Sequence, residues 1–302
     1  MENPRLIKKR VRSIGNIGKI TKALEMVAAA KVQRAQEKAL RSKPYGKKIY
    51  ELTQSFAGKA DPGSVPLLKL PDKIDNQLYI LVSSNRGLAG SLNTNLLRNL
   101  ATFLKTQVTK KYYFINLGKK SRNFSLNNGE LLADYSDVLT WSTTIVSIVG
   151  LVCDKFIKSE VDEVYLVYSD FRSALLQEPQ IKRLLPLQKA EIGEEKSEVF
   201  NLKDSVAHQK KPEVPEGVYN FEPSAESVLE SILPYYLETE ILEVLYEAEA
   251  SEHSARMVAM KNASDNASDL TGSLSLEYIK ARQSAITTEI NDIVTAGMSL
   301  GA

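Results

Sequence analysis

Residues Lys19–Lys31 read KITKALEMVAAAK, and they lie inside a stretch, Glu2–Lys43, that no proline interrupts after Pro4. Apolar residues recur in this stretch at steps of three and four, which is the spacing of one face of an α-helix. The stripe comprises Ile7, Val11, Ile14, Ile17, Ile20, Leu24, Ala28, Val32, Ala35 and Ala39. Small residues dominate its second half, so a partner helix can approach closely. We expect one helix from about Arg5 to Phe56.

The end of the chain carries a second pattern of the same kind. No proline follows Pro234, and apolar residues again recur at helical spacing. They are Leu237, Ile241, Leu245, Ala248, Ala255, Ala259, Leu270, Leu274, Ile286, Ile290 and Ile293. Because a proline suits the first turn of a helix, we expect this helix to start near Pro234. Gly272 is a tolerable weak point that costs about 1 kcal/mol.

Neither helix can bury its apolar stripe alone, so the two ends of the chain are expected to pair. Charge favours this pairing, because basic residues dominate positions 1–59 whereas acidic residues dominate from Ser224 onward. Each exposed ion pair would add only about 0–1 kcal/mol. Neither stripe keeps a strict seven-residue repeat. We therefore expect a loosely wound antiparallel coiled coil in which the longer C-terminal helix projects beyond its partner.

The middle of the chain has the pattern of an α/β domain. Three short apolar runs are typical of buried strands, namely Leu78–Ser83, Tyr112–Leu117 and Val164–Tyr168. Two stretches of helical length, Ser91–Gln107 and Trp141–Lys158, lie between them. That alternation predicts βαβ units and a mostly parallel sheet.

The rest of the middle segment completes the expected organisation. We interpret Phe171–Leu187 as a further pair of strands, and the polar, proline-bearing Glu191–Pro215 as a loop. The fold class is therefore α/β, with an antiparallel coiled coil of the two terminal helices and a Rossmann-like middle domain. The expected domains are an N-terminal helix over residues 1–59, the α/β domain over residues 73–220 and a C-terminal helix over residues 224–302.

Composition limits the class of protein. The chain has 302 residues and a net charge of +2, with the apolar and charged fractions of a soluble globular protein. The longest apolar run, Ile145–Cys153, is shorter than the roughly 20 residues of a membrane span. Cys153 is the one cysteine, which excludes an intrachain disulfide and suits a reducing cytoplasm. We interpret it as a small buried hydrophobe.

The motif that most resembles a site for chemistry is VSSNRGLAGSLN at Val82–Asn93, because it follows a strand and opens a helix, where a phosphate loop would lie. It lacks the Lys-Ser/Thr of a Walker A loop and the glycine spacing of a dinucleotide fingerprint. Gly87 and Gly90 then need only satisfy a tight turn, with Ser91 or Asn93 capping the helix. A nucleotide-binding α/β enzyme, dimerised through its terminal helices, stays open as an alternative.

Other residue types do not indicate a catalytic centre. The two histidines, His208 and His253, are far apart in the sequence, and there is no Cys/His cluster or closely spaced carboxylate motif. We therefore expect no catalytic residue, no cofactor and no metal. The basic N-terminal helix could bind nucleic acid. It lacks interleaved aromatic residues and has an apolar stripe to bury, so we expect no nucleic-acid partner.

Three long motifs resemble the gamma-subunit family of the F-type rotary ATP synthases. They are KITKALEMVAAAK at Lys19–Lys31, SSNRGLAGSLN at Ser83–Asn93 and EHSARMVAMKNA at Glu252–Ala263, the last continued by LEYIKARQSAITTEI at Leu276–Ile290. Because they lie at the start, middle and end of the sequence, the resemblance covers the whole chain.

The resemblance implies a central rotor shaft that couples rotation of an ion-driven c ring in the membrane to ATP synthesis or hydrolysis. Catalysis would take place in a ring of alpha and beta subunits, so the shaft itself would be a non-catalytic subunit. An epsilon subunit would bind its α/β part. With no transit sequence visible, we expect a bacterial protein, peripheral to the cytoplasmic side of the inner membrane.

The resemblance also implies roles for individual residues. By position in the matched motifs, Lys22, Arg282 and Gln283 are expected to contact the mobile catch regions of the beta subunits. Arg256 and Glu289 are expected to support coupling. The segment YNFEP at Tyr219–Pro223 resembles the foot of the shaft near the c ring, with Tyr219 and Glu222 as candidate contacts.

Overall fold

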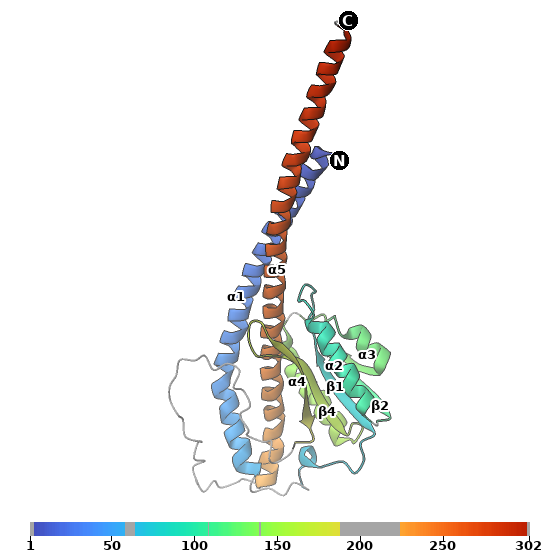
Figure 1. Cartoon of the computed structure of the whole chain (residues 1–302). Helices are drawn as coiled ribbons and strands as arrows, with labels where there is room; N and C mark the ends of the chain where they lie inside the picture. Colours follow the sequence, from blue (N-terminus) through green and yellow to red (C-terminus); the bar gives the residue numbers. More distant parts are fainter. Residues whose placement is uncertain (1–2, 58–63, 108, 139, 188–223, 301–302) are drawn as a thin grey trace. The chain divides into compact units, whose positions relative to one another are not determined.

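The computed structural model describes residues 3–57, 64–107, 109–138, 140–187 and 224–300. It divides into two compact units, Met1–Ala29 with Arg256–Ala302 and Ala30–Ala255. Two long helices, α1 (Pro4–Ala57, 54 residues) and α5 (Ala225–Leu300, 76 residues), each contribute to both units (Figure 1). The predicted fold class, long terminal helices with an α/β middle, is confirmed.

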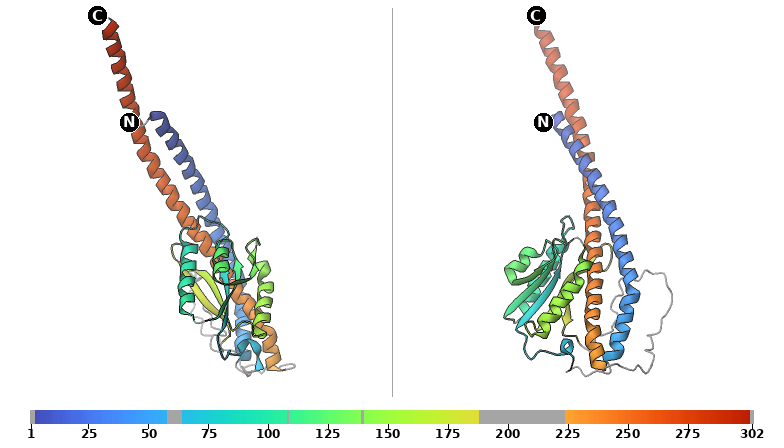
Figure 2. Two further views of the ribbon diagram at one scale, coloured as in Figure 1. Left: turned by 90° about the vertical axis from the view of Figure 1, so that its right-hand side faces the viewer. Right: turned by 180° about the vertical axis from the view of Figure 1, so that it is seen from behind.

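In the first unit the beginning of α1 packs antiparallel against the end of α5 (Figure 2). The helices approach closely at Gly18, where an added Cβ would lie 3.3 Å from the Cβ of Ala267. The hydroxyl of Ser264 also donates a hydrogen bond of 3.5 Å to the carbonyl oxygen of Gly18. The antiparallel register from this contact places Pro4 level with Ala281. Helix α5 then continues for about 19 residues, roughly 28 Å, beyond the start of α1, as predicted.

The covered positions of this helix pair follow a seven-residue repeat. Buried or partly buried positions recur at steps of three and four, and they are Ile7, Val11, Ile14, Gly18, Thr21, Glu25 and Ala28 in α1, and Met260, Ser264, Ala267, Thr271, Leu274, Tyr278 and Ala281 in α5. We call these residues the seam. The expectation of an irregular repeat was wrong, because small and polar residues occupy seam positions. A regular repeat of seven indicates left-handed winding.

Several residues of the predicted apolar stripes lie outside the seam. The exposed fractions of Ile17, Ile20 and Leu24 are 52%, 59% and 37%. On α5, Leu270 is 52% and Ile286 is 43% exposed. Assigning them to the buried face was wrong. Ile17, Ile20, Leu24 and Leu270 each lie one position before a seam residue, so they point about 100° away from it and stay exposed.

The second unit is built on one five-stranded sheet with the order β3-β2-β1-β4-β5. The strands are β1 (Asn76–Val82), β2 (Lys111–Leu117), β3 (Glu130–Asp134), β4 (Glu163–Phe171) and β5 (Gln177–Leu185). The first four are parallel, with Tyr79 of β1 opposite Tyr165 of β4, and β5 runs antiparallel to β4. The prediction of a mostly parallel sheet is confirmed.

Two details of the sheet differ from the prediction. Phe171–Leu187 does not hold a pair of strands, because β4 extends to Phe171 and only β5 follows it. The segment also includes the turn that joins these two strands. Strand β3 was not predicted, because its apolar run, residues 131–133, is only three residues long and its interior residues are only partly buried.

Helices cover both faces of the sheet (Figure 1). The remaining helices are α2 (Leu92–Thr106), α3 (Arg122–Asn128), α4 (Ile145–Ile157) and the 3-10 turns Pro66–Leu68 and Trp141–Thr144. Successive residues of β1 point to opposite faces. Leu78 and Ile80 pack in a core with α4, α5 and α1, whereas Tyr79 and Leu81 pack in a second core with α2.

Helix α5 begins at Ala225, nine residues before the predicted start at Pro234, which lies inside the helix. A proline inside a helix removes one backbone hydrogen bond and costs about 3 kcal/mol. The leucines on the neighbouring turns, Leu229, Leu233 and Leu237, are fully buried. Each contributes roughly 1.5–3 kcal/mol on burial, so packing outweighs the proline.

In the second unit the second half of α1 packs on the first half of α5. The rings of Tyr50 and Tyr236 meet edge to face at 5.2 Å, and the Tyr50 hydroxyl donates a hydrogen bond of 2.9 Å to Glu243. An ion pair of 3.3 Å joins Lys38 of α1 to Glu249 of α5. The opposite charges of the two ends therefore meet at this contact, as predicted.

The seam generates a stability prediction. Gly18→Leu is expected to lower the free energy of unfolding by about 1–3 kcal/mol, because the larger side chain cannot fit against Ala267 without separating the helices. Gly15→Leu is the matched control, since nothing lies within 4 Å of a Cβ added at Gly15. Its stability should hold or rise, because leucine favours a helix more than glycine does. Urea unfolding followed by circular dichroism compares the two, and equal losses would contradict the seam.

Candidate functional site

The first place to look for a ligand is the crevice at the carboxyl ends of β1 and β4, because the strand order reverses there. Ten residues line what remains of this crevice. They are Val82, Ser83, Ser84, Leu92, Asn93, Leu96, Trp141, Ser169, Ala248 and Glu252. The remaining cavity has a volume of about 10 Å³. Such a volume holds one water molecule at most.

Helix α5 occupies the position that a nucleotide takes in related α/β folds. Ala248 and Glu252, which line the crevice opposite the strand ends, both belong to α5. Ligand pockets for small molecules typically measure about 300–1,000 Å³. The crevice is therefore filled by the chain itself, and the nucleotide-binding alternative is not favoured.

The loop after β1 is held by its own side chains. The backbone N–H of Ser84 donates to the amide oxygen of Asn93 at 3.1 Å, and the amide nitrogen of Asn93 donates to the Ser84 hydroxyl at 2.7 Å. Ser91 occupies the N-cap position of α2, as expected, but its side chain makes no capping hydrogen bond, and the side chain of Asn93 binds Ser84. Gly90 adopts φ +56°, which confirms its role in the turn.

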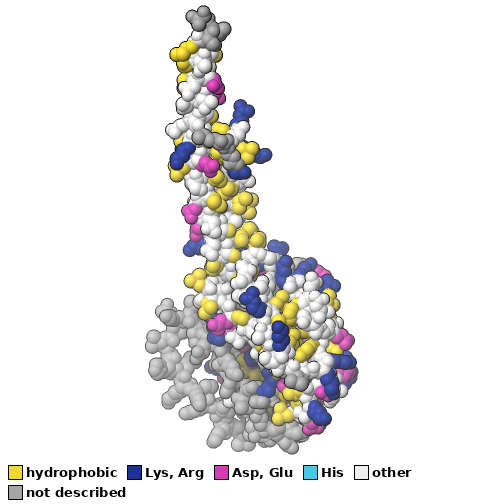
Figure 3. All heavy atoms as spheres, turned by 45° about the vertical axis from the view of Figure 1, so that its right-hand side comes forward, with side chains coloured by type: hydrophobic (Ala, Val, Ile, Leu, Met, Phe, Trp, Pro, Cys, Tyr) yellow, Lys and Arg dark blue, Asp and Glu magenta, His cyan; other side chains and the backbone are white. Residues whose placement is uncertain are grey.

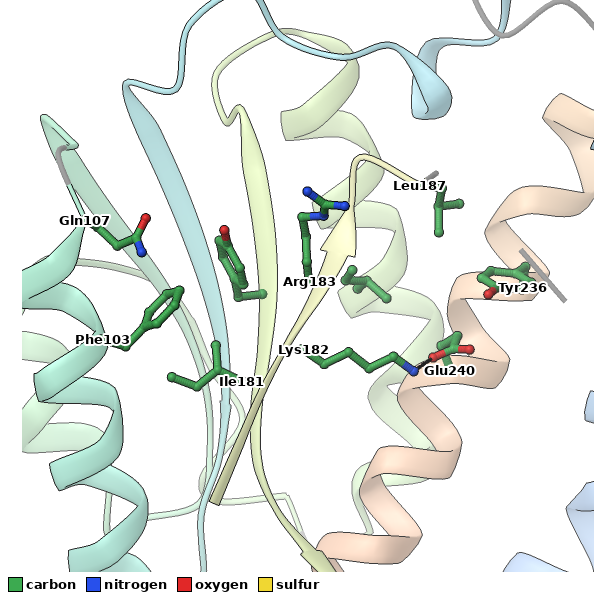
Figure 4. A pocket seen from close by; sticks show the side chains of 10 residues that line it. Phe103, Gln107, Ile181, Lys182, Arg183, Leu187, Tyr236 and Glu240 are labelled. Atoms are coloured by element: carbon green, nitrogen blue, oxygen red, sulfur yellow. Dashed lines mark hydrogen bonds and ion pairs between the residues drawn. The ribbon is translucent and has the colours of Figure 1, made fainter. Parts of the chain in front are cut away.

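A larger, open cavity of about 430 Å³ lies between α2, β5 and α5 (Figure 4). Phe103 of α2 and Ile181 of β5 form part of its wall, and the ammonium group of Lys182 pairs with the carboxylate of Glu240 across it. Its lining residues, all within the described part of the chain, include no histidine, cysteine or serine. The two charged groups at this point, Lys182 and Glu240, neutralise each other in an ion pair.

Other reactive groups are also in structural positions. Cys153 packs against the core, and burial raises the pKa of its thiol to about 11, so the thiol stays protonated. In the described ranges no group of three or more His, Cys, Asp or Glu residues could hold a metal ion. Within the same ranges no helix is long and apolar enough to cross a membrane.

The residues expected to contact partners are at the surface of the first unit. The side chain of Lys22 is 57% exposed and pairs with Glu25 at 2.9 Å. Arg282, Gln283 and Glu289 are exposed on the part of α5 that continues beyond α1. Arg256 is partly buried.

The structure does not bring these residues into one cluster. In the antiparallel register of the seam, Lys22 lies level with Ala263, so Arg282 and Gln283 are roughly 28 Å further along α5. The two other candidates, Tyr219 and Glu222, lie outside the described residues. The predicted contacts thus form two separate levels along the helix pair.

Sequence analysis missed an exposed apolar surface on the same helices. We call it the outer apolar surface, and it comprises Ile17, Ile20, Met26, Val27, Leu270, Leu276, Ile279, Ile290, Ile293 and Met298. Figure 3 shows apolar side chains exposed along these helices. Assigning positions by a strict 3.5-residue period, in place of apolar character alone, would have found it. Apolar surfaces of this extent mark sites of protein association.

The chain is similar to known proteins over its whole length. A family model described as ATP synthase matches residues 3–300. The ATP synthase gamma chain of Methylacidiphilum infernorum is 38% identical over 309 residues, covering 100% of both chains. The ATP synthase gamma chain of Herpetosiphon aurantiacus is 36% identical over 315 residues, covering 99% of each.

The chain belongs to the ATP synthase gamma-chain family. The predicted resemblance is therefore confirmed, and membership of this family makes the chain a subunit of an ATP synthase. Two solved structures share the fold of the family. One is the Euglena gracilis mitochondrial ATP synthase, with 20% identity, a TM-score of 0.62 and coverage of 98% of this chain and 94% of the other. The other is the Tetrahymena thermophila mitochondrial ATP synthase central stalk, with 23% identity, a TM-score of 0.55 and coverage of 81% and 99%.

The filled crevice predicts that the full-length chain does not bind nucleotides. Titration of the purified chain with ATP or NAD in a calorimeter should give no saturable heat, because α5 leaves only about 10 Å³ at the switch point. Saturable binding in the micromolar range would revive the enzyme alternative.

Proposed function

We propose that the chain is a non-catalytic rotor subunit that transmits torque between an ion-driven c ring and the catalytic alpha and beta subunits of an F-type ATP synthase. Family membership supports the place of the chain in the enzyme. The observation that carries the mechanical role is the seam of the first unit, in which two helices are wound closely through small residues.

The seam supports torque transmission in two ways. Two helices in continuous contact resist bending better than one, because bending must also displace the packed side chains of the partner. Small seam residues such as Gly18 and Ala267 also leave larger apolar side chains outside. The pair can therefore be stiff inside and apolar outside, which suits a shaft that turns within a close-fitting bearing.

Coupling would depend on the asymmetry of the shaft. The outer apolar surface and the exposed charges differ from one side of the helix pair to the other, so a surrounding ring would meet different contacts in different directions. A rotor that contacts each catalytic subunit differently stabilises a different conformation in each. Rotation would then shift these conformations in sequence, and the coupling operates in both directions.

Individual contacts are assigned by the matched motifs. We propose that Lys22, Arg282 and Gln283 contact the mobile catch regions of the beta subunits. Their exposure at two levels of the helix pair supports contacts at two heights within the ring. Arg256, partly buried, and Glu289, exposed, are proposed to support coupling.

The remaining proposals concern the lower part of the molecule and its place in the cell. The α/β domain, residues 73–220, would bind an epsilon subunit, with Tyr219 and Glu222 near the c ring. Residues 1–59 and 224–302 would form the shaft. The matched gamma chains named above come from bacteria, which supports a peripheral location on the cytoplasmic side of a bacterial inner membrane.

Assembly is the first test of this function. The chain, expressed with alpha and beta subunits, should co-elute with them on gel filtration. The rate of ATP hydrolysis by the alpha and beta subunits should rise when the chain is present, whereas the purified chain alone should hydrolyse no ATP. Failure to co-elute under mild conditions would contradict the proposal. The non-catalytic role would be contradicted if the purified chain alone hydrolysed ATP. The control is the same purification from cells that carry the empty vector, which should show no ATP hydrolysis.

Coupling through the upper level is tested by Arg282→Ala and Gln283→Ala. Each is expected to lower the rate of ATP synthesis in membrane vesicles several-fold, because a charged or amide contact is lost, while both residues are exposed and the fold stays intact. Lys280→Ala is the matched control for Arg282→Ala, since Lys280 is also exposed and lies about 200° around the helix from Arg282. An unchanged rate in both Arg282→Ala and Gln283→Ala, or an equal loss in Arg282→Ala and Lys280→Ala, would contradict the assignment.

A further inference from the structure

Three glutamates of α5, Glu240, Glu243 and Glu247, recur at steps of three and four and therefore share one face of the helix. Within the second unit, this face meets three other elements. Glu240 pairs with Lys182 of β5, and Glu243 accepts a hydrogen bond from Tyr50 of α1. Glu247 interacts electrostatically with Asp170 of β4. We call these three glutamates and Asp170 the carboxylate cluster.

Cations only partly compensate this concentration of acidic groups. Lys182 acts on both Glu243 and Glu247, but it already forms the ion pair with Glu240. Lys43 of α1 also acts on Glu243. Arg172 lies 2.9 Å from Asp170 and acts on it from the turn after β4.

The surroundings of the cluster favour protonated carboxyls. Burial, and then repulsion from Glu240, raises the pKa of Glu243 to about 7. Burial, followed by repulsion from Asp170 and Glu243, raises the pKa of Glu247 to about 8. Tyr168 of β4 is a further acidic group beside Glu247, and burial raises its pKa well above neutral, so it stays uncharged.

The side-chain contacts of Asp170 also favour a protonated carboxyl in the cluster. Its side chain is 7% exposed, and its Oδ1 atom is buried without a hydrogen-bond partner. Burial raises the pKa of Asp170 as well. A buried carboxylate oxygen without a donor is costly, and a shared proton in the cluster reduces that cost.

We propose that the carboxylate cluster is a proton-dependent clasp. With Glu243 and Glu247 protonated, α5 packs against α1, β4 and β5 without a negative charge on either group. When both groups lose their protons, burial and repulsion among the four carboxylates loosen this packing, because the contacts from Tyr50, Lys43 and Lys182 compensate the new charges only in part. The proposal goes beyond the rotor function and does not depend on it, because every residue of the clasp belongs to the second unit.

The direction of the pH dependence follows from the raised pKa values. Below the ordinary glutamate value of 4.5, the folded and unfolded chains are both protonated at these positions, so they contribute no pH dependence. Between 4.5 and about 7–8 the folded chain holds up to two more protons than the unfolded chain. Folding therefore weakens as the pH rises through this window, by up to about tenfold in the folding constant per pH unit and per group. Above about 8 the dependence levels off.

The test uses the full-length chain with Glu243→Gln, Glu247→Gln and both together. Glutamine keeps the shape of a protonated glutamate but cannot ionise. Each single variant should therefore lower the number of protons bound on folding by about one, and raise the free energy of unfolding at pH 8.5. Glu230→Gln is the matched control, because Glu230 is an exposed residue of α5 in the same unit. Urea unfolding between pH 5.5 and 9 measures the slopes. Unchanged slopes in the Glu243 and Glu247 variants would overturn the proposal.

A local measurement separates the clasp from a general effect of pH. After correction for intrinsic exchange rates, amide exchange in residues 43–57 of α1 should rise between pH 6.5 and 8.5 relative to that in α2, and the double variant should abolish the rise. Tyr50→Phe removes the hydrogen bond that lowers the pKa of Glu243, so it should move the rise to higher pH. Equal changes in α1 and α2, or a shift to lower pH in Tyr50→Phe, would contradict the clasp.

Discussion

The structure depends on the mutual burial of two helices that neither could stabilise alone. Each terminal helix carries more apolar surface than it can cover by itself. In the first unit the two meet through a seven-residue repeat that brings Gly18 close to Ala267. The seam combines small residues at this contact with larger ones, such as Ile7 and Tyr278, at other positions. Large apolar residues one position away from the seam stay exposed, where they are available to a partner.

The same helix α5 also determines what the α/β domain can do. In the second unit its side chains Ala248 and Glu252 fill the crevice at the switch point of the sheet, which in doubly wound folds receives a ligand. A Rossmann-like sheet is therefore used here as a support for helices. The family relationship agrees with this conclusion, since the chain matches gamma chains of ATP synthases over its full length.

Packing of α5 in the second unit has an electrostatic consequence. The helix buries leucines on one side, and the neighbouring side places three glutamates beside α1, β4 and β5. Glu243 and Glu247 are partly buried there, and burial together with repulsion among the carboxyls raises the pKa of both groups, which favours their protonated forms. The tight contact that stabilises the unit thus makes its stability sensitive to protons.

The sequence by itself determined the long terminal helices, the mostly parallel sheet and the family, because helical periodicity, short apolar runs and long motifs are local properties of a chain. It placed Ile17, Ile20 and Leu24 in the buried stripe and started α5 at Pro234. Both errors arose because the buried face and the helix start depend on what packs against the helix. Only the tertiary structure showed that α5 fills the nucleotide crevice and that Glu243 and Glu247 share a cluster with Asp170. These properties come from residues distant in sequence, and their free energies depend on the burial that folding creates.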